Sequence, residues 1–245
     1  MNPTVTIVEV LGRSSQGMSK PFLCRGGDGA LYYAKGRNTD MNALCCEWIA
    51  GNLGRDMGLR IPDFAIADVP QSLVAASDRS DIYELGSGLV FVSKRLENAR
   101  EISWSEAKAC HNTLKAEVLS FDLWVHNEDR AFSQLGGNPN LLMDQDGLSV
   151  FDFNLAFDPA FTREGYFEKH IFGPLLPAWP VGFQDTTMPK MRAVLGRFDE
   201  IFDALPLEWL HIDGDESLPV QIDRKLVHET LSSPFNDPDS FWNRP

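Results

Sequence analysis

The chain has 245 residues, 43% hydrophobic and 23% charged, a composition that is usual for a folded globular protein and argues against extensive disorder. Its formal net charge of −13 argues against a nucleic-acid partner, because affinity for nucleic acid depends on Lys and Arg that neutralise phosphates. No apolar run approaches the roughly 20 residues of a membrane span, the first residues lack the features of a secretory signal, and the four cysteines show no C-x-x-C spacing. We therefore expect a cytoplasmic protein with no membrane partner.

The first hundred residues predict mostly β-strand. Residues 5–11 alternate in polarity and are rich in β-branched side chains, which is typical of a half-buried strand. The short apolar runs 21–25 and 30–35 flank a glycine-rich turn at 26–29, which predicts a hairpin because glycine and aspartate tolerate the backbone of tight turns. Residues 41–57 carry apolar side chains at helical spacing, so one helix follows the hairpin.

Strand is expected again at 61–69 and at 89–92, on either side of a polar, turn-rich insertion at 71–88. The pattern then becomes helical, since apolar positions across 104–125 are spaced for the core face of one or two helices. The strand-rich part therefore ends near residue 98.

A polar loop at 126–130 is followed by a predicted strand hairpin whose arms are 141–143 and 148–153. Helices are expected around 188–205 and 223–231, joined by proline-rich connections. The final residues, 233–245, are rich in turn signals and are expected to be loosely held.

The loop from Ser14 to Lys20, between two predicted strands, is a candidate cradle for phosphate. Loops with glycine and serine can direct backbone N–H groups and hydroxyls at phosphate oxygens. The candidate contacts in this loop are Ser14, Gly17, Met18 and Ser19. Taken alone the signal is weak, because most such loops are ordinary hairpin turns, and the loop is not a G-x-x-x-x-G-K-[ST] motif.

Lys35 closes a predicted strand, and Glu47 lies twelve residues further on in the predicted helix. A strand lysine paired with a helix glutamate is the arrangement that active protein kinases require around the nucleotide phosphates. Without other evidence, a solvated lysine and a solvated helix face are the more common explanation of the two residues.

Asp129, Asn138 and Asp152 are the more specific part of the pattern. Asp129 lies in the polar loop, Asn138-Pro139-Asn140 precedes the first strand of the next hairpin, and Asp152 interrupts its second strand, which is otherwise apolar. The hairpin would bring an asparagine and an aspartate to one point beside Asp129. Oxygen ligands of this kind suit Mg²⁺, which combines a few carboxylates with waters and substrate phosphates.

Across roughly residues 8–210 the sequence resembles the HipA-like kinases. The resemblance is carried by Tyr33-Ala34-Lys35, by Glu47-Trp48-Ile49-Ala50 and by the motif Phe121-Asp122-Leu123-Trp124-Val125-His126-Asn127-Glu128-Asp129-Arg130. It continues in Asn138-Pro139-Asn140-Leu141-Leu142 and Phe151-Asp152-Phe153. Each piece is common, but their combination in this order is specific.

The resemblance implies an α+β, two-lobed protein-kinase-like fold with the active-site cleft between the lobes. Residues 1–98 would form an N-lobe with a nucleotide-binding β-sheet and one helix. Residues 99–232 would form a helical C-lobe with the catalytic and metal-binding loops, and 233–245 the loosely held tail.

The resemblance also implies roles for individual residues. Lys35 would contact the phosphates of ATP and Glu47 would position it, while Asp129 would be the catalytic aspartate. Mg²⁺ would be held mainly by Asp152, with Asn138 or Asn140 as its second ligand. A hinge would hold the adenine through backbone groups of Phe91, Val92, Ser93 and Arg95.

The chain departs from the family pattern in three places, one of which is His126, which makes its loop more polar than expected. Nine residues separate Asp129 from Asn138, a longer spacing than the family usually has, so either Asn138 or Asn140 can be the ligand. Phe153-Asn154 follows Asp152 where relatives more often have histidine and glycine. The expected activity is ATP- and Mg²⁺-dependent phosphorylation of Ser or Thr in an unidentified protein, with the enzyme itself as one candidate. The alternatives are a small-molecule kinase acting on an antibiotic, a sugar or a lipid headgroup, and a nucleotide-binding pseudokinase module.

Overall fold

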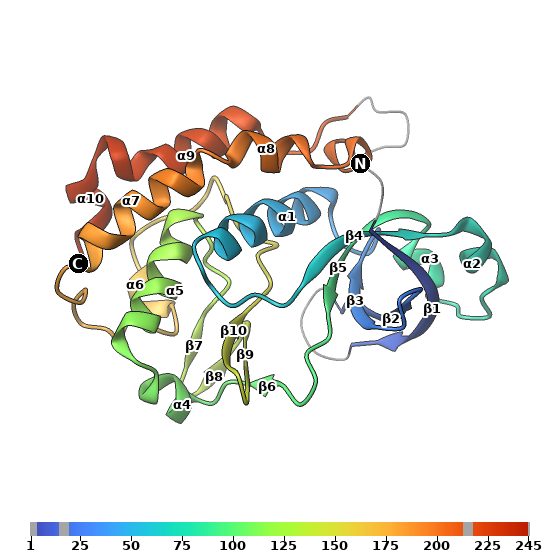
Figure 1. Ribbon diagram of the computed structural model, residues 1–245, viewed down its shortest axis with the longest axis horizontal. Helices are drawn as coiled ribbons and strands as arrows, with labels where there is room; N and C mark the ends of the chain where they lie inside the picture. Colours follow the sequence, from blue (N-terminus) through green and yellow to red (C-terminus); the bar gives the residue numbers. More distant parts are fainter. Residues whose placement is uncertain (1–3, 15–19, 213–217, 245) are drawn as a thin grey trace.

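The computed structural model describes residues 4–14, 20–212 and 218–244. Within these residues, five strands of the N-terminal part close into a barrel, at the right of Figure 1. β1 pairs with β2 in antiparallel fashion and with β4 in parallel, which closes the sheet on itself. The order around the barrel is β1 (Val5–Arg13), β2 (Phe22–Gly26), β3 (Leu31–Lys35), β5 (Gly88–Lys94) and β4 (Phe64–Val69).

Alternation along β3 explains how the barrel presents side chains to both of its sides. Tyr32 and Ala34 are buried in the barrel core, so Tyr33 and Lys35 face the outside, where a pocket lies. The hairpin between β2 and β3 is the predicted one, with Gly29 at φ +84° and the Asp28 carboxylate accepting from the backbone N–H of Ala30.

Helix α1 (Met41–Asp56) lies against the barrel and also packs on helices of the C-terminal part (Figure 1). The Asp40 carboxylate accepts from the N–H of Asn42 and caps its first turn. Leu44, Ile49 and Leu53 are fully buried in the larger hydrophobic core. The predicted helix at 41–57 is therefore confirmed, and its Glu47 is carried on a rigid element.

The segment 71–88, predicted as a turn-rich insertion, contains two short helices instead, α2 (Gln71–Ala76) and α3 (Ile82–Leu85). Val74, Ile82 and Leu85 are buried in the core of the barrel. Three apolar side chains among polar neighbours were too few to show a helical period, although they cover one end of the barrel.

Of the one or two helices expected across 104–125, the structure has two: α4 (Trp104–Ala109) and α5 (Asn112–Trp124). Ser103 and Glu106 form a capping box at the start of α4. The C-terminal part also contains short strands and further helices. They are β6 (Arg100–Glu101), β7 (Phe132–Ser133), β8 (Gly136–Gly137), β9 (Leu141–Asp144), β10 (Gly147–Val150), α6 (Tyr166–Lys169), α7 (Phe183–Leu195), α8 (Phe198–Asp203), η1 (Leu207–Leu210), α9 (Arg224–Asn236) and α10 (Pro238–Trp242).

The hairpin predicted around residues 141–153 is formed by β9 and β10, but its second strand ends at Val150. Asp152 lies two residues beyond that strand, with φ +61°, and Asn140 lies just before β9 with φ +46°. The expectation that Asp152 interrupts a strand is therefore wrong. Both residues lie in left-handed backbone at the same end of the hairpin, where the ladder stops and side chains can turn toward one another.

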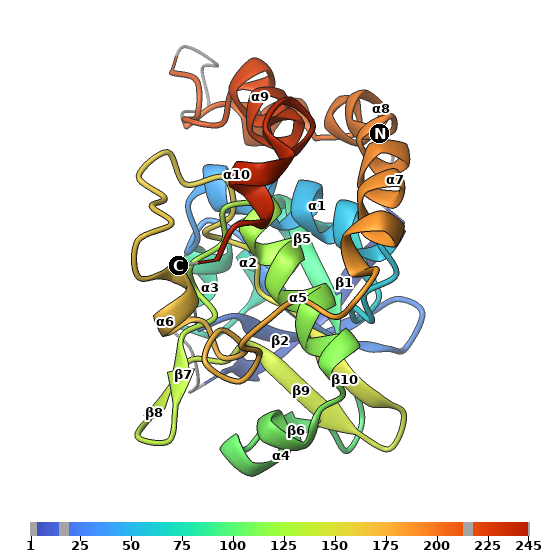
Figure 2. The same cartoon turned by 90° about the vertical axis from the view of Figure 1, so that its left-hand side faces the viewer.

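The end of the chain is packed rather than loosely held, so that expectation is wrong for residues 233–244. Phe241 and Trp242 of α10 are buried, and the ring of Trp242 meets those of Trp179 and Phe183 edge-on. α10 lies beside α9 (Figure 2). The aromatic residues that make these contacts are too close together in sequence to show a helical period. The many turn-forming residues of 233–245 therefore suggested a loosely held tail.

We expect Trp242→Ala to lower the free energy of unfolding by about 3–5 kcal/mol, because it leaves a cavity among aromatic rings. Urea denaturation followed by circular dichroism measures the change. Tyr83→Ala removes an aromatic ring that is 72% exposed and is the matched control, with an expected change below about 0.5 kcal/mol. Equal effects of the two substitutions would contradict the packed C-terminus.

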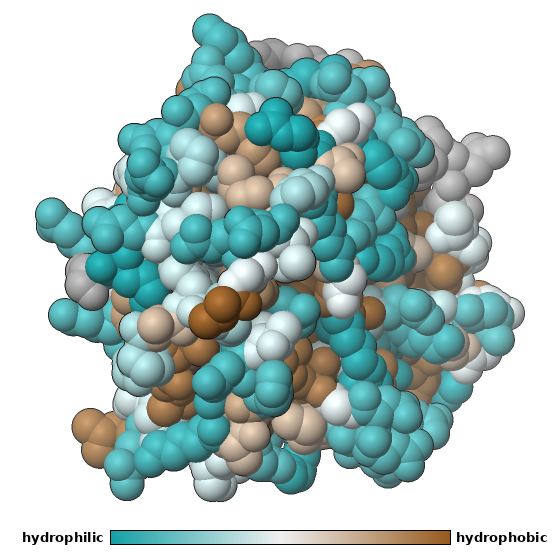
Figure 3. Space-filling model, turned by 60° about the vertical axis from the view of Figure 1, so that its left-hand side comes forward, coloured by the Kyte–Doolittle hydropathy of each residue, from teal (hydrophilic) through white to brown (hydrophobic). Residues whose placement is uncertain are grey.

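The visible surface is mostly hydrophilic, with apolar side chains confined to separate patches (Figure 3). Among the described residues, no helix combines the length and apolar character that crossing a membrane requires.

Candidate active site

A pocket of about 570 Å³ lies where the barrel, α1 and the β9–β10 hairpin meet. One wall is apolar and includes the stacked rings of Phe64 and Phe91. Another part of the lining, its polar end, holds Lys35, Glu47 and Asp152. The lining residues that the sequence had singled out are Ser14, Lys35, Glu47, Phe91, Ser93, Arg95, Asn138, Asn140 and Asp152.

Lys35 is the centre of a buried ion cluster at the polar end. Its Nζ donates to Glu47 Oε1 at 2.5 Å and to Asp152 Oδ1 at 2.7 Å. The other oxygen of Glu47, Oε2, accepts from the backbone N–H of Phe153 at 3.0 Å. Glu47 therefore holds both the lysine and the backbone next to Asp152, which joins three chain segments that are distant in sequence.

The cluster is strongly coupled electrostatically. Burial would lower the pKa of Lys35, but the charges of Glu47 and Asp152 outweigh burial and raise that pKa above its usual range. Burial raises the pKa of Glu47 to about 7, against the opposing effect of Lys35. For Asp152 the charge of Lys35 outweighs burial and lowers the pKa. Lys35 is thus a permanent cation at the end of the pocket.

Asp129 is held beside this cluster by both candidate asparagines. Its Oδ2 accepts from Asn140 Nδ2 at 3.0 Å and from Asn138 Nδ2 at 3.3 Å, and its backbone carbonyl accepts from Asn140 Nδ2 at 2.9 Å. Burial and the negative charge of Asp152 raise the pKa of Asp129. Asp129 is absent from the pocket lining among the described residues, but both asparagines bonded to it line the pocket.

The structure places the other predicted contacts unevenly. Ser14 lines the pocket, whereas Gly17, Met18 and Ser19 lie outside the described residues. The side chain of Val92 is fully buried in the barrel core, so only its backbone groups are left for the expected hinge contact.

The expected hinge also needs a correction. β5 pairs with β3 on one side and with β4 on the other, and the backbone N–H groups of Lys94 and Arg95 donate to the carbonyls of Asp63 and Leu31. These two N–H groups are used inside the protein, so the N–H of Arg95 is not available to an adenine. The following residues Leu96, Asn98 and Ala99 line the pocket as the chain leaves the barrel.

The side chains present fit a magnesium ion. The net charge is −2 when Lys35, Glu47, Asp152 and Asp129 are all ionised. Oxygen atoms that could bind a metal are present in the side chains of Asp129, Asp152, Asn138 and Asn140, and oxygen is the ligand atom that Mg²⁺ prefers. In the described part of the chain, no three His, Cys, Asp or Glu side chains come together as a complete metal site.

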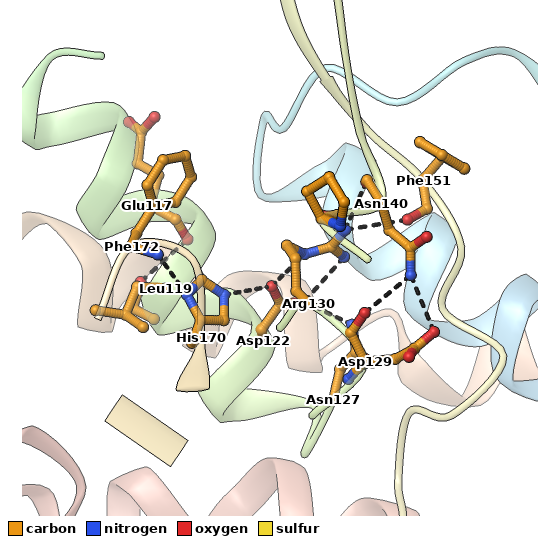
Figure 4. A network of polar contacts seen from close by, with 12 residues as sticks. Glu117, Leu119, Asp122, Asn127, Asp129, Arg130, Asn140, Phe151, His170 and Phe172 are labelled. Carbon is orange, nitrogen blue, oxygen red and sulfur yellow. Dashed lines mark hydrogen bonds and ion pairs between the residues drawn. The ribbon is translucent and has the colours of Figure 1, made fainter. Parts of the chain in front are cut away.

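A second layer of buried residues had not been assigned a role from sequence: Asp122, Arg130 and His170. Asp122 on α5 accepts from Arg130 Nε at 2.6 Å, and Arg130 lies between Asp122 and the Asn140 segment (Figure 4). The signal available in the sequence was an aspartate on an otherwise apolar helix face, where an ionised side chain requires a partner.

A strand lysine anchored by a helix glutamate, next to a loop aspartate with asparagine partners, is the arrangement by which protein kinases handle a nucleotide. The class of protein is therefore a kinase-type phosphotransferase. A model of the HipA-like kinase family matches residues 7–245, nearly the whole chain. The chain belongs to the HipA-like kinase family, which confirms the resemblance seen in the sequence.

One solved structure shares the fold. The chain is similar to a Helicobacter pylori proinflammatory kinase, CtkA, with a TM-score of 0.53 and 11% identity, over 96% of this chain and 95% of that one. It also matches the open conformation of CtTel1 with a TM-score of 0.36 and 12% identity, over 93% of this chain and 11% of that one. The FAT and kinase domain of CtTel1 matches with a TM-score of 0.36 and 11% identity, over 95% and 22%. No curated protein matches. The mixed α/β fold with a strand-rich N-terminal part is thus that of a known kinase.

Proposed function

We propose that the protein is an ATP- and Mg²⁺-dependent kinase that phosphorylates serine or threonine in a protein, with itself as one candidate acceptor. The observation that carries the proposal is the buried Lys35–Glu47–Asp152 cluster at the end of a pocket, beside an Asp129 bonded to two asparagines. In this proposal the barrel and α1 act as an N-lobe, the helical part acts as a C-lobe, and the pocket is the cleft between them.

The nucleotide would lie along the pocket. Its adenine fits the apolar wall near Phe64 and Phe91, with backbone groups of Leu96–Ala99 as hydrogen-bond partners. Its phosphates would reach Lys35, whose charge is fixed by two carboxylates. Ser14 lines the same pocket and leads into the loop that would cover the phosphates.

Asp129 is the catalytic carboxylate in this proposal. It orients the acceptor hydroxyl and accepts its proton as the hydroxyl oxygen bonds to the γ-phosphorus, while the bond between that phosphorus and the β–γ bridging oxygen breaks and ADP leaves. Its raised pKa suits this role, since a base with a higher pKa takes a proton more readily. Asp152, with Asn138 or Asn140, would hold Mg²⁺, which neutralises phosphate charge.

Two measurements test the function. ATP with magnesium should raise the melting temperature, because a ligand bound only by the native state stabilises it. Incubation with [γ-³²P]ATP should then label the protein itself or proteins of a cell lysate, in phosphoserine or phosphothreonine. Label that migrates only with small solutes would indicate a small-molecule kinase, and binding without any transfer would indicate a pseudokinase module.

Lys35→Met should weaken ATP binding by about tenfold or more, because the phosphates lose a buried cation and face Glu47 and Asp152 instead. Isothermal titration calorimetry with magnesium-ATP measures the change. Lys115 is the matched control, because it is also a buried lysine, yet it donates to the carbonyl of Lys108, away from the pocket. Lys115→Met should keep wild-type affinity, and unchanged affinity in Lys35→Met would remove Lys35 from the site.

A further inference from the structure

A fully buried ionic network lies directly behind Asp129. Asp122 and Arg130 have no exposed surface and His170 is 2% exposed. The Asp122 carboxylate accepts from Arg130 Nε at 2.6 Å, from Arg130 Nη2 at 3.2 Å, from Asn127 Nδ2 at 2.9 Å and from His170 Nε2 at 3.0 Å. Four donors therefore converge on one carboxylate.

The histidine has a defined role in this network. Its Nδ1 accepts from the backbone N–H of Phe172 at 3.1 Å, so the ring proton is on Nε2 and points at Asp122. Burial lowers the pKa of His170, which keeps the ring neutral. His170 thus holds the Asp122 carboxylate from the side opposite Arg130 (Figure 4).

The second half of the Arg130 guanidinium reaches the site segments. Nη1 donates to the carbonyl of Asn140 at 2.6 Å and to that of Phe151 at 3.1 Å, with a longer contact to Pro139 at 3.4 Å. Arg130 itself follows Asp129 in the chain, Asn140 bonds to Asp129, and Phe151 precedes Asp152. One guanidinium therefore ties together the three backbone segments that present Asp129, Asn140 and Asp152.

This arrangement is hard to explain by stability alone. A buried ion pair contributes little net stability relative to apolar residues of the same volume, because desolvation offsets the attraction between the charges. The planar guanidinium of Arg130 does fix the relative positions of the groups that it binds, which an apolar side chain cannot do. Asn140 and Asp152 both lie in left-handed backbone, so their segments need such external support.

We propose that Arg130, held by Asp122 and His170, is a positioning residue that fixes Asp129, Asn140 and Asp152 relative to one another and so sets both magnesium affinity and the rate of phosphoryl transfer. The inference rests on the proposed kinase function and deepens it. Arg130 does not line the nucleotide pocket, so its loss should change the chemistry and the response to magnesium more than the contacts with adenine.

Arg130→Lys tests the proposal, because lysine keeps the charge but cannot bind Asp122 and the carbonyls together. Two readouts use the full chain: the magnesium concentration that gives half of the ATP-induced rise in melting temperature, and the rate of ³²P release or transfer from [γ-³²P]ATP. We expect the half-saturating magnesium concentration to rise about tenfold and the rate to fall about 100-fold.

Trp124→Phe is the matched control. Trp124 is fully buried on the same helix as Asp122, and its Nε1 donates to the carbonyl of Leu231, away from the site. The substitution should lower the melting temperature without changing the rate or the magnesium response at a temperature where the protein is folded. A purely structural network would make Arg130→Lys behave in the same way, and that result would overturn the proposal.

His170→Phe keeps the test decisive if Arg130→Lys does not fold. Phenylalanine preserves a ring between Tyr166 and Phe172 but cannot donate to Asp122. We expect a rate about tenfold below wild type with a raised magnesium requirement, and a wild-type rate and magnesium response would overturn the proposal. A wild-type protein that neither binds magnesium-ATP nor transfers phosphate would instead refute the kinase function itself.

Discussion

Asp129→Ala should reduce phosphoryl transfer by about 10²–10⁴-fold while leaving ATP binding nearly unchanged. The aspartate bonds to Asn138 and Asn140 rather than to Lys35, and the Lys35–Glu47–Asp152 cluster does not depend on it. Removing a carboxylate whose pKa is raised by burial and by Asp152 also relieves repulsion. The variant should therefore fold. Transfer from [γ-³²P]ATP and calorimetric titration with magnesium-ATP separate the two effects.

Glu128→Ala is the control for that substitution. Glu128 is the neighbouring acid, but it is exposed and its Oε1 accepts from the backbone N–H of Thr162. We expect its transfer rate to stay within about twofold of wild type, because surface changes rarely alter a rigid site. If Asp129→Ala transferred phosphate as fast as Glu128→Ala, Asp129 would not be the catalytic carboxylate.

Local sequence patterns predicted the barrel hairpin and the pairing of Lys35 with Glu47. The glycine-rich turn sets the register of β2 and β3, and strand alternation then directs Lys35 out of the barrel core. The helical period of α1 places Glu47 on a buried face. Both signals act over a few residues, so a single sequence was enough to find them.

The features that the sequence did not reveal depend on contacts between residues far apart in the chain. Val92 and Arg95 were assigned to a hinge, but β5 lies between β3 and β4 and its backbone is used on both sides. That position follows from strand order, which no local pattern encodes. Arg130 was visible in the motif, yet its role depends on the carbonyls of Asn140 and Phe151. His170, which bonds to the Asp122 carboxylate that holds Arg130, lies 48 residues from that aspartate.

The conformation of Asp152 was also beyond a local reading. Its residue type predicted a functional acid in an apolar run, which the buried contact with Lys35 supports. The left-handed φ of +61° depends on Arg130 and Glu47, which bind the backbone of Phe151 and Phe153 on either side of it. The sequence therefore pointed to Asp152 as a functional acid. The direction of its side chain depends on tertiary contacts that a local pattern does not show.

Asp152→Ala should abolish the magnesium-dependent part of ATP binding. The wild-type cluster combines Lys35 with Glu47 and Asp152, so alanine leaves a neutral Lys35–Glu47 pair and the pocket intact. At a magnesium-ATP concentration 100 times its Kd the wild type gains about 2.7 kcal/mol of stability. The variant should show the same small shift in melting temperature with ATP and EDTA as with ATP and magnesium, because the carboxylate proposed as the main metal ligand is gone.

Asp146→Ala is the matched control for this experiment, because Asp146 lies in the turn of the same β9–β10 hairpin but is exposed and makes a long ion pair, 3.8 Å, with Arg60. It should keep the full magnesium-dependent shift. A magnesium response that survived in Asp152→Ala would mean that Asp129 and the two asparagines hold the ion without it. Asp152 would then not be the main metal ligand, although it contacts Lys35 and lines the pocket together with Asn140.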